Sequence, residues 1–386
     1  MEVYIPRKFT SPNKSFFLFG ARGTGKSTFL KNNYPDALWI DLLLPNEFRT
    51  YSAKPERIIE LINGNPDKKT IIIDEIQKVP DLLSAVHSII EEKRDLQFIL
   101  TGSSARKLRK EGLNLLAGRL LFKTFHPFLF AEVRDKWESN VILKNGLLPI
   151  VFSSSTPKET LEAYVSLYIK EEVQQESLVR NIGNFTRFLE AISFSHGSLL
   201  NISNVARECE IERKVVENYI KILEDILLAD RLQVFSKRAK RAIVKHPKFY
   251  FIDTGVFNTL RPKGPLDNPE EIDGAALEGL IFQQLKTWNA YSNNPYQISF
   301  WRSQGGVEVD FILYGEKNIY AIEVKNTNRI RPADLRSLQA FAKDYPQSKQ
   351  IFLYRGENQL RRNNILCMPV TNFLDKLIPN KNLDLE

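Results

Sequence analysis

The chain has 386 residues, of which 43% are hydrophobic and 26% are charged, a composition typical of folded globular proteins and not of disordered or fibrous chains. Its 54 lysines and arginines outnumber its 46 aspartates and glutamates, and the formal net charge of +8 favours a polyanionic partner such as nucleic acid, although a slightly basic enzyme has the same balance. Two cysteines and four scattered histidines exclude a disulfide framework and the usual zinc-ligand spacings, and no apolar run approaches the roughly 18 residues of a membrane span. Since the N-terminus lacks the apolar core of a signal peptide, we expect a cytoplasmic protein with no membrane partner.

The first of three expected domains, residues 1–135, alternates short apolar runs with helical stretches. Mostly apolar runs with few polar breaks are typical of strands in a parallel sheet that helices cover on both faces. One intervening stretch, Asp81–Asp95, repeats its apolar residues at helical spacing. The sequence thus predicts an α/β fold of the doubly wound type. The expected strands are Phe16–Gly20, Ala37–Leu42, Thr70–Asp74, Leu96–Thr101 and Leu120–Phe125.

The loop after the first strand matches the phosphate-loop pattern G-x-x-x-x-G-K-[ST], with a strand before it and a helix after it. Its glycines let backbone amides curl around phosphates at a helix N-terminus. Lys26 would place its charge on the β- and γ-phosphates, and the Ser27 hydroxyl would bind Mg²⁺. We therefore expect a nucleoside triphosphate site formed by Gly20, Ala21, Arg22, Gly23, Thr24, Gly25, Lys26, Ser27 and Thr28.

Two acids, Asp74 and Glu75, follow the third apolar run at the edge of the sheet where ligands bind in such folds. Asp74 would hold Mg²⁺ through water, and Glu75 would orient and deprotonate the attacking water. The next run ends before Ser103 and Ser104, and either hydroxyl could lie between the acid and the γ-phosphate. A simple strand-to-loop turn explains these serines nearly as well.

Arg119 ends the short loop sequence Ala117-Gly118-Arg119. An arginine on an exposed loop can stabilise transition-state charge in the site of a neighbouring subunit. An ordinary surface or ion-paired arginine explains the residue equally well from chemistry alone.

The second expected domain, residues 136–260, resembles a winged helix that binds DNA. Ser203 or Asn201 would cap one helix, a second would span Arg213–Leu228, and the strand Arg231–Phe235 would lead into a basic ribbon. Glutamates offset the charge of the second helix, so contact with backbone phosphates is favoured over base reading, and a plain packing module is the alternative. The expected nucleic-acid contacts are Lys237, Arg238, Lys240, Arg241, Lys245 and Lys248.

The third expected domain, residues 261–386, follows a proline- and glycine-rich linker and carries the D…E-x-K pattern of PD-(D/E)XK nucleases. Asp310 and Glu323 lie on consecutive predicted strands, and period two places Glu323 and Lys325 on the same side. Asp310, Glu323 and the upstream helical acid Glu278 would bind Mg²⁺, which would activate water against a phosphodiester. Lys325 would position the nucleophile or neutralise the phosphate. The alternative is a degenerate nuclease fold kept for DNA binding or oligomer contacts.

Taken in order, these motifs resemble the AAA+ family ATPases with a DUF4143 C-terminal region. Besides the phosphate loop, the matching runs are Ile71–Gln77, Leu100–Leu108, Leu116–Arg119, His126–Val133, Tyr250–Leu260, Ala276–Leu285, Trp301–Leu313 and Ile322–Lys325. The resemblance implies an AAA+ sheet of strand order 5-1-4-3-2 and self-association into a ring or partial ring, most often a hexamer. It also favours Arg119 as a residue that acts in a neighbour's site.

The leading hypothesis is an ATP-hydrolysing AAA+ protein that binds DNA and carries a Mg²⁺-dependent nuclease-like C-terminal domain. One alternative is a nucleotide-dependent regulatory switch whose C-terminal domain binds but does not cut nucleic acid. Another is a protein-remodelling ATPase, which would be stimulated by polypeptide instead of DNA.

Overall fold

The computed structural model describes residues 4–92, 95–104, 116, 118–135, 138–175, 181–236, 246–381 and 383. By contacts, the chain divides into two compact units, which we call the smaller and the larger unit. The smaller unit comprises Phe9–His126 with Glu224–Leu227, and the larger unit comprises Met1–Lys8, Pro127–Leu223 and Leu228–Glu386.

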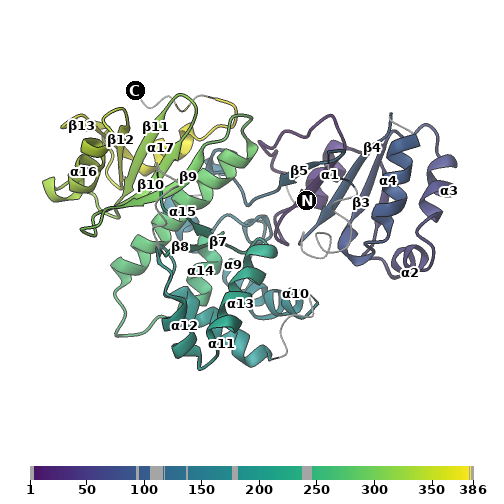
Figure 1. The fold of residues 1–386 in the computed structure, drawn as a ribbon, viewed down its shortest axis with the longest axis horizontal. Coiled ribbons are helices and arrows are strands. Elements are labelled where there is room, and N and C mark those ends of the chain that lie inside the picture. Colours follow the sequence, from purple (N-terminus) through teal and green to yellow (C-terminus); the bar gives the residue numbers. More distant parts are fainter. Residues whose placement is uncertain are drawn as a thin grey trace. The chain divides into compact units, whose positions relative to one another are not determined.

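The smaller unit is built on a five-stranded parallel sheet of order β2-β3-β4-β1-β5. This order confirms the expected 5-1-4-3-2 arrangement. Figure 1 shows α4 beside β3 and β4 and α3 beyond α4, and residues of these helices and strands share one buried apolar core. The elements are β1 (Phe16–Phe19), α1 (Lys26–Asn33), β2 (Leu38–Asp41), α2 (Pro45–Ala53), α3 (Arg57–Asn63), β3 (Thr70–Asp74), η1 (Ile76–Lys78), α4 (Leu82–Glu92), β4 (Gln97–Gly102) and β5 (Leu121–Thr124).

The larger unit begins with a mainly helical part that contains a small sheet of order β6-β8-β7. The three strands pair in antiparallel fashion, with β8 in the centre. The elements are α6 (Phe130–Val133), α7 (Ser139–Asn145), α8 (Pro149–Phe152), α9 (Pro157–Ala163), η3 (Tyr164–Tyr168), α10 (Ile169–Gln175), α11 (Ile182–Ser193), β6 (Ser198–Leu199), α12 (Ile202–Cys209), α13 (Arg213–Asp225), β7 (Ala229–Leu232), β8 (Lys248–Phe251) and α14 (Thr254–Leu260).

The predicted helix-turn-helix stretch forms two helices, α12 and α13, with local differences at their ends. Asn201 is the N-cap of α12, since its side chain accepts a hydrogen bond from the Asn204 amide at 3.1 Å. The second helix ends earlier than expected, at Asp225, because Leu227 adopts a left-handed backbone with φ of 58°. The strand that follows accordingly begins at Ala229.

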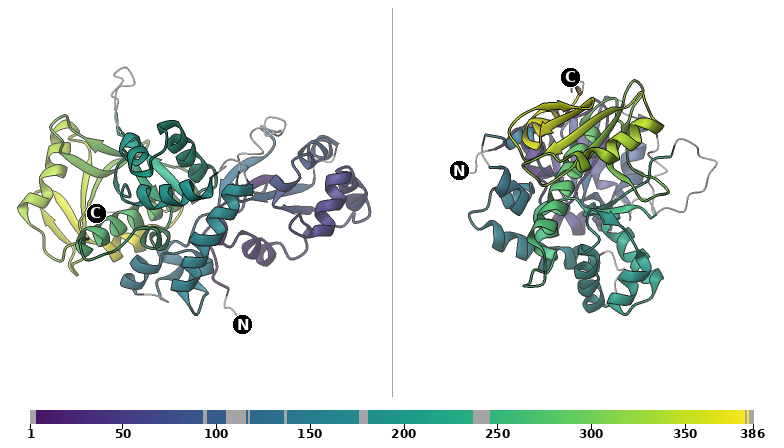
Figure 2. Two further views of the ribbon diagram at one scale, coloured as in Figure 1. Left: turned by 90° about the horizontal axis from the view of Figure 1, so that it is seen from below. Right: turned by 90° about the vertical axis from the view of Figure 1, so that its left-hand side faces the viewer.

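The C-terminal part of the larger unit is a mixed six-stranded sheet of order β13-β14-β12-β11-β10-β9, whose strands lie side by side in Figure 2. Helix α16 packs its apolar side into the core on one face of this sheet. Phe282 of α15 stacks on Phe311 of β10. The elements are α15 (Pro269–Tyr291), β9 (Gln297–Arg302), β10 (Glu308–Tyr314), β11 (Ile319–Val324), η4 (Pro332–Leu335), α16 (Arg336–Asp344), β12 (Lys349–Tyr354), β13 (Leu360–Arg362), β14 (Ile365–Pro369) and α17 (Val370–Lys376).

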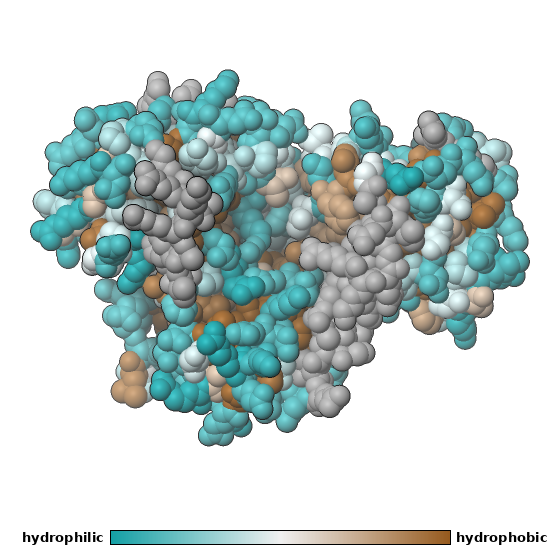
Figure 3. All heavy atoms as spheres, in the orientation of Figure 1, coloured by the Kyte–Doolittle hydropathy of each residue, from teal (hydrophilic) through white to brown (hydrophobic). Residues whose placement is uncertain are grey.

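On the face drawn in Figure 3, hydrophilic residues make up most of the described surface. Within the described ranges, none of the helices combines the length and the apolar character that crossing a bilayer requires.

Candidate nucleotide site and carboxylate cluster

The phosphate loop joins the buried strand β1 to helix α1 through a backbone that requires glycine. Gly25 precedes α1 with φ of 84°, which lies in the left-handed region where glycine has no steric penalty. At Gly20, an added Cβ would lie 2.3 Å from the Phe125 carbonyl oxygen, so this position has no room for a side chain. These two constraints explain why the loop turns tightly at the carboxyl end of β1.

Lys26 is buried at the first position of α1, with its ammonium turned onto the loop. Its Nζ donates to the carbonyl oxygens of Gly20 at 2.6 Å and Ala21 at 3.3 Å. The Thr24 hydroxyl also donates to the Ala21 carbonyl, at 2.7 Å. Thr24 and Lys26 thus hold the loop as a defined turn, whereas Arg22 and Thr28 are exposed at its rim.

Asp74 connects the phosphate loop to the neighbouring strands. The Ser27 hydroxyl donates to Asp74 Oδ2 at 2.7 Å, and the Thr101 hydroxyl donates to Asp74 Oδ1. Since β3 pairs with β4 and Ile73 lies opposite Leu100, the residues that follow, Asp74 and Thr101, are neighbours at the edge of the sheet. Sequence reasoning did not identify Thr101, although its position at the end of a parallel strand was a usable signal.

Glu75 lies immediately beyond Asp74 with a left-handed φ of 60°, an unusual conformation for a residue with a Cβ. The Thr101 hydroxyl accepts a hydrogen bond from the Glu75 amide at 3.2 Å. Gln77 donates through Nε2 both to Glu75 Oε2 and, at 3.1 Å, to the Ser103 hydroxyl. Ser103 therefore lies within the same network as Glu75, linked through Gln77, which sequence reasoning had not singled out.

Arg119 forms an ion pair with Glu91 at the end of α4. It precedes β5, whereas the phosphate loop follows β1, and the two strands run parallel with Phe19 opposite Thr124. At about 3.3 Å per residue, β5 from Leu121 to Thr124 spans on the order of 10 Å, and Arg119 precedes the start of this strand. Arg119 thus lies toward the edge of the sheet opposite to the phosphate loop of its own chain.

The donors at this edge of the sheet suit a magnesium–nucleotide complex. A hydroxyl and a carboxylate that already lie 2.7 Å apart, Ser27 and Asp74, are hard oxygen ligands of the type that Mg²⁺ prefers. Lys26 and the N-terminal end of α1 supply the positive potential that phosphates require. The residues present therefore fit the group that the sequence predicts.

In the larger unit, the predicted nuclease residues gather around two lysines. Lys248 of β8 places its Nζ 2.9 Å from Glu278 Oε1, 3.1 Å from Asp310 Oδ1 and 2.7 Å from Glu308 Oε1. Lys325 pairs with Glu323 Oε1 at 2.7 Å. The expected hairpin of β10 and β11 is present, and Asp310 Oδ2 accepts a hydrogen bond from the Val324 amide at 3.0 Å.

Burial and the surrounding charges shift the protonation equilibria of this carboxylate cluster. Burial, followed by the charge of Asp310, raises the pKa of both Glu278 and Glu323. Burial alone would lower the pKa of Lys248, but Tyr250 and the surrounding carboxylates hold that pKa well above its ordinary value. Lys248 therefore carries its full positive charge inside the cluster.

This arrangement differs from the predicted second metal centre and from the predicted role of Lys248. Lys248 was expected on an exposed basic wing, yet the residue is only 2% exposed, because its ammonium forms ion pairs with buried carboxylates. Throughout the described part of the chain, no group of three or more histidines, cysteines, aspartates or glutamates is arranged to hold a metal ion. Glu278 and Asp310 are brought together, but around an ammonium, whereas Glu323 pairs with Lys325.

Family models match three consecutive stretches of the chain. One described as "AAA domain" matches residues 12–134, and one described as "Domain of unknown function (DUF4143)" matches residues 273–373. The chain carries an AAA domain followed by a DUF4143 domain. A third model, "Domain of unknown function (DUF8612)", matches residues 141–267, between the AAA and DUF4143 domains.

Curated relatives resemble the chain over much of its length. An uncharacterized protein of Mycobacterium tuberculosis is 22% identical over 311 residues, which is 79% of this chain and 69% of that protein. An uncharacterized protein of Haemophilus influenzae is 23% identical over 217 residues, covering 52% of this chain and 54% of that protein.

Among solved structures, the replication initiator DnaA bound to AMPPCP and single-stranded DNA covers 56% of this chain and 83% of its own, with 14% identity and a TM-score of 0.31. Protein VC1899 from Vibrio cholerae covers 94% of this chain and 96% of its own, with 11% identity and a TM-score of 0.22.

The basic ribbon that was expected to bind nucleic acid lies between the AAA and DUF4143 domains. Five of its six predicted contacts fall outside the described residues, namely Lys237, Arg238, Lys240, Arg241 and Lys245. The described strands on either side, β7 and β8, pair with each other. In the sequence, the ribbon falls between β7 and β8.

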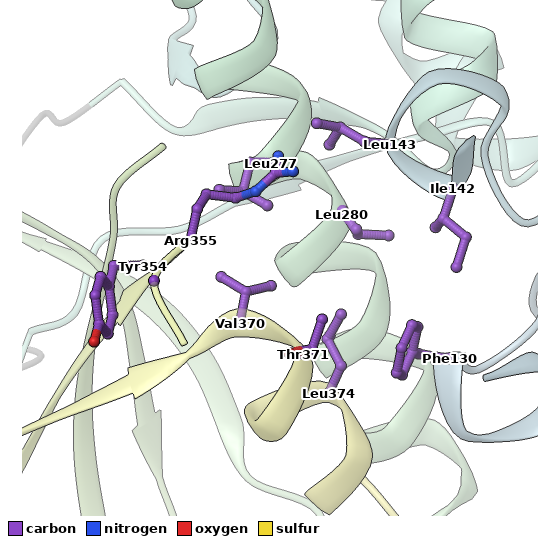
Figure 4. A pocket seen from close by; sticks show the side chains of 11 residues that line it. Phe130, Ile142, Leu143, Leu277, Leu280, Tyr354, Arg355, Val370, Thr371 and Leu374 are labelled. Carbon is purple, nitrogen blue, oxygen red and sulfur yellow. The ribbon is translucent and has the colours of Figure 1, made fainter. Parts of the chain in front are cut away.

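A small cavity of about 110 Å³ opens between α7, α15 and α17 in the larger unit. Its walls are mostly apolar, with Phe130, Leu280 and Leu374 on different helices, and the Arg355 guanidinium extends toward Leu277 (Figure 4). No acid lines it in the described chain, so this cavity does not offer the ligands of a metal or phosphoryl-transfer centre.

Proposed function

We propose that the AAA domain binds ATP with Mg²⁺ and hydrolyses it. The observation that carries this proposal is the continuous network from the phosphate loop to the strand ends, in which Asp74 accepts hydrogen bonds from Ser27 and Thr101. Such a network brings the positive, hydroxyl and carboxylate groups required for phosphoryl transfer to one edge of a parallel sheet.

Each residue of the network would have a distinct role. Lys26 would turn from its loop carbonyls toward the β- and γ-phosphates, and Ser27 with Asp74 would hold Mg²⁺, which neutralises phosphate charge when bound. Glu75 would accept the proton of the attacking water. Gln77 would set the orientation of the Glu75 carboxylate, which supports Ser103 as part of the same network.

Arg119 would act in the site of a neighbouring subunit. Its position toward the far edge of its own sheet supports this role, since a residue there cannot reach the phosphates bound by its own chain. The Glu91 ion pair would be exchanged for the phosphate when subunits associate. We therefore propose a ring or partial ring, with a hexamer as the expected form.

We further propose that the region between the AAA and DUF4143 domains binds DNA through its basic wing. The element order β6, α12, α13, β7, β8 with sheet order β6-β8-β7 supports a winged helix. Because the Lys248 ammonium lies among the carboxylates of Glu278, Glu308 and Asp310, we favour the regulatory alternative, in which the nuclease-like DUF4143 domain binds nucleic acid without cutting it.

ATP turnover measured with and without DNA tests this proposal. Wild-type protein should release phosphate in a Mg²⁺-dependent manner, and Glu75→Gln should bind ATP but release phosphate at least about 100-fold more slowly. Equal turnover by Glu75→Gln would contradict the assigned base. Metal-dependent cleavage of plasmid DNA that disappears in Asp310→Asn would refute the regulatory alternative.

A further inference from the structure

The carboxylate cluster of the DUF4143 domain already contains a cation that belongs to the chain. Lys248 reaches it from β8, which lies outside the matched DUF4143 range. Three carboxylates, from Glu278 on α15 and from Glu308 and Asp310 on β10, lie 2.7 to 3.1 Å from its Nζ. The side chain of Lys248 is 3% exposed, so solvent does not compete for these contacts.

The ammonium donates hydrogen bonds to Glu278 and Asp310 and also forms an ion pair with Glu308. An ammonium has three N–H donors and no acceptor, and here three carboxylates surround it. Glu278 is fixed from a second direction, because the Tyr250 hydroxyl donates to Glu278 Oε1 at 2.6 Å. The cluster is therefore organised around Lys248 and not merely located near it.

The backbone of Lys248 is also held in place. β8 is the central strand of its sheet, and Lys248 is opposite Leu199 on one side and Leu232 on the other. A lysine anchored between two strands keeps its ammonium at one point, as a bound ion would be kept.

The charges match a divalent cation only when Lys248 is removed. Arg302 also contacts Glu308, with its Nη1 2.9 Å from Oε2. Three carboxylates with two cations, Lys248 and Arg302, sum to a charge of −1; without Lys248 the sum is −2, which a divalent ion would balance.

We propose that Lys248 is the resident cation of this cluster and takes the place of a divalent metal ion in the DUF4143 domain. The native chain then needs no metal here, and its three carboxylates are closed to Mg²⁺ or Mn²⁺. Removing the ammonium exposes a new divalent-cation site formed by Glu278, Glu308 and Asp310. This inference does not depend on ATP hydrolysis, which concerns the other unit of the chain.

Manganese binding to the full-length, nucleotide-free protein tests the proposal. Wild type and Lys248→Met are titrated with Mn²⁺ and the free ion is followed by electron paramagnetic resonance. We expect Lys248→Met to bind Mn²⁺ at least about tenfold more tightly than wild type. The gain should disappear in Lys248→Met combined with Asp310→Asn. Lys286→Met is the matched control, because Lys286 pairs with Asp230 outside the cluster, and it should bind like wild type.

Lys248→Gln is the second variant, used in case Lys248→Met does not fold, because glutamine is of similar size and can donate hydrogen bonds. A Mn²⁺-dependent rise in its unfolding temperature, absent in wild type, supports the proposal even if Lys248→Met unfolds. Nucleotide-free wild type that binds Mn²⁺ in an Asp310-dependent manner overturns it. A folded Lys248→Met or Lys248→Gln protein that binds Mn²⁺ no better than wild type also overturns it. If neither variant folds, failure of Mn²⁺ to restore folding in both overturns it as well.

Discussion

Two buried lysines, one in each unit, have opposite surroundings. Lys26 donates to backbone carbonyls of its own loop, whereas Lys248 forms ion pairs with three carboxylates from two elements. A carbonyl is a dipole that a phosphate can displace, but a buried carboxylate carries a full charge that needs its partner. The same residue type can therefore serve a ligand in one place and close a site in another.

The acids of the two sites differ in the same way. Asp74 accepts hydrogen bonds from the neutral hydroxyls of Ser27 and Thr101, so its charge is not cancelled by them. Asp310 contacts an ammonium and a backbone amide. The groups that contact an acid, more than its place in a sequence pattern, determine whether it can receive a metal ion.

The largest effect is expected from Lys26→Ala in the AAA domain. Loss of the charge that stabilises the transferred phosphate should reduce ATP turnover by about 10³-fold or more. Phosphate release measured at saturating ATP checks this, with Lys31→Ala on the same helix as the control, because Lys31 lies over the Trp39 ring. Normal turnover in Lys26→Ala would show that Lys26 does not serve the phosphates, and the proposed contrast with Lys248 would be wrong.

Arg119→Ala should lower turnover by about 10³-fold without preventing ATP binding, because an arginine supplied to a neighbouring site acts on the transition state. The sharper measurement mixes this variant with Lys26→Ala. At mixed interfaces an intact phosphate loop meets an intact Arg119, so the mixture should recover activity that neither variant has alone. A mixture that stays inactive while it co-assembles would argue against action between subunits.

Lys248→Met should destabilise the larger unit by about 3–5 kcal/mol, because it leaves buried carboxylates without their counter-charge. Chemical denaturation at neutral pH in the presence of a chelator measures this. Lys286→Met should cost at most about 1 kcal/mol, since the Lys286–Asp230 pair is about one-third exposed. Equal losses for the two variants would show that Lys248 has no special role in the cluster.

A smaller effect concerns His196, which lies against Gly279 of α15, the residue that follows Glu278. An added Cβ at Gly279 would lie 2.2 Å from His196 Nε2, so the two are in close contact. Burial lowers the pKa of His196 to about 3, so the folded protein keeps the ring neutral while the unfolded chain binds a proton below its ordinary pKa of 6.5. The free energy of unfolding should therefore fall by up to about 1.4 kcal/mol per pH unit as the pH decreases below 6.5.

Urea unfolding between pH 7 and pH 5 tests this by comparing wild type with His196→Gln, in which that contribution to the slope should be absent. His246→Gln, at an exposed histidine, is the control for the substitution itself. An unchanged slope in His196→Gln would show that the ring does not stay neutral.

The fold of the AAA domain could be predicted largely from sequence because its signals are local. Mostly apolar runs located all five strands, and the residues of Gly20–Thr28 predicted a loop whose backbone indeed requires glycine. The register of β3 against β4 also makes Thr101 a neighbour of Asp74. This neighbourhood can be predicted once the ends of the two strands are known.

The environment of Lys248 could not be predicted in the same way. Its partners lie 30 to 62 residues away in the chain, on α15 and β10, and only tertiary packing brings them to one ammonium. In sequence, Lys248 is the last of six basic residues, and composition alone assigned it to the exposed ribbon. The D…E-x-K pattern likewise located the correct strands, but not the cation between the acids.

The most direct test counts the divalent ions that one native chain binds. Wild-type protein with a saturating, non-hydrolysable ATP analogue is titrated with Mn²⁺, and the stoichiometry is read from the free-ion signal. The account predicts a single ion per chain, dependent on the analogue and lost in Lys26→Ala. A second ion per chain, retained without nucleotide and lost in Asp310→Asn, would contradict it.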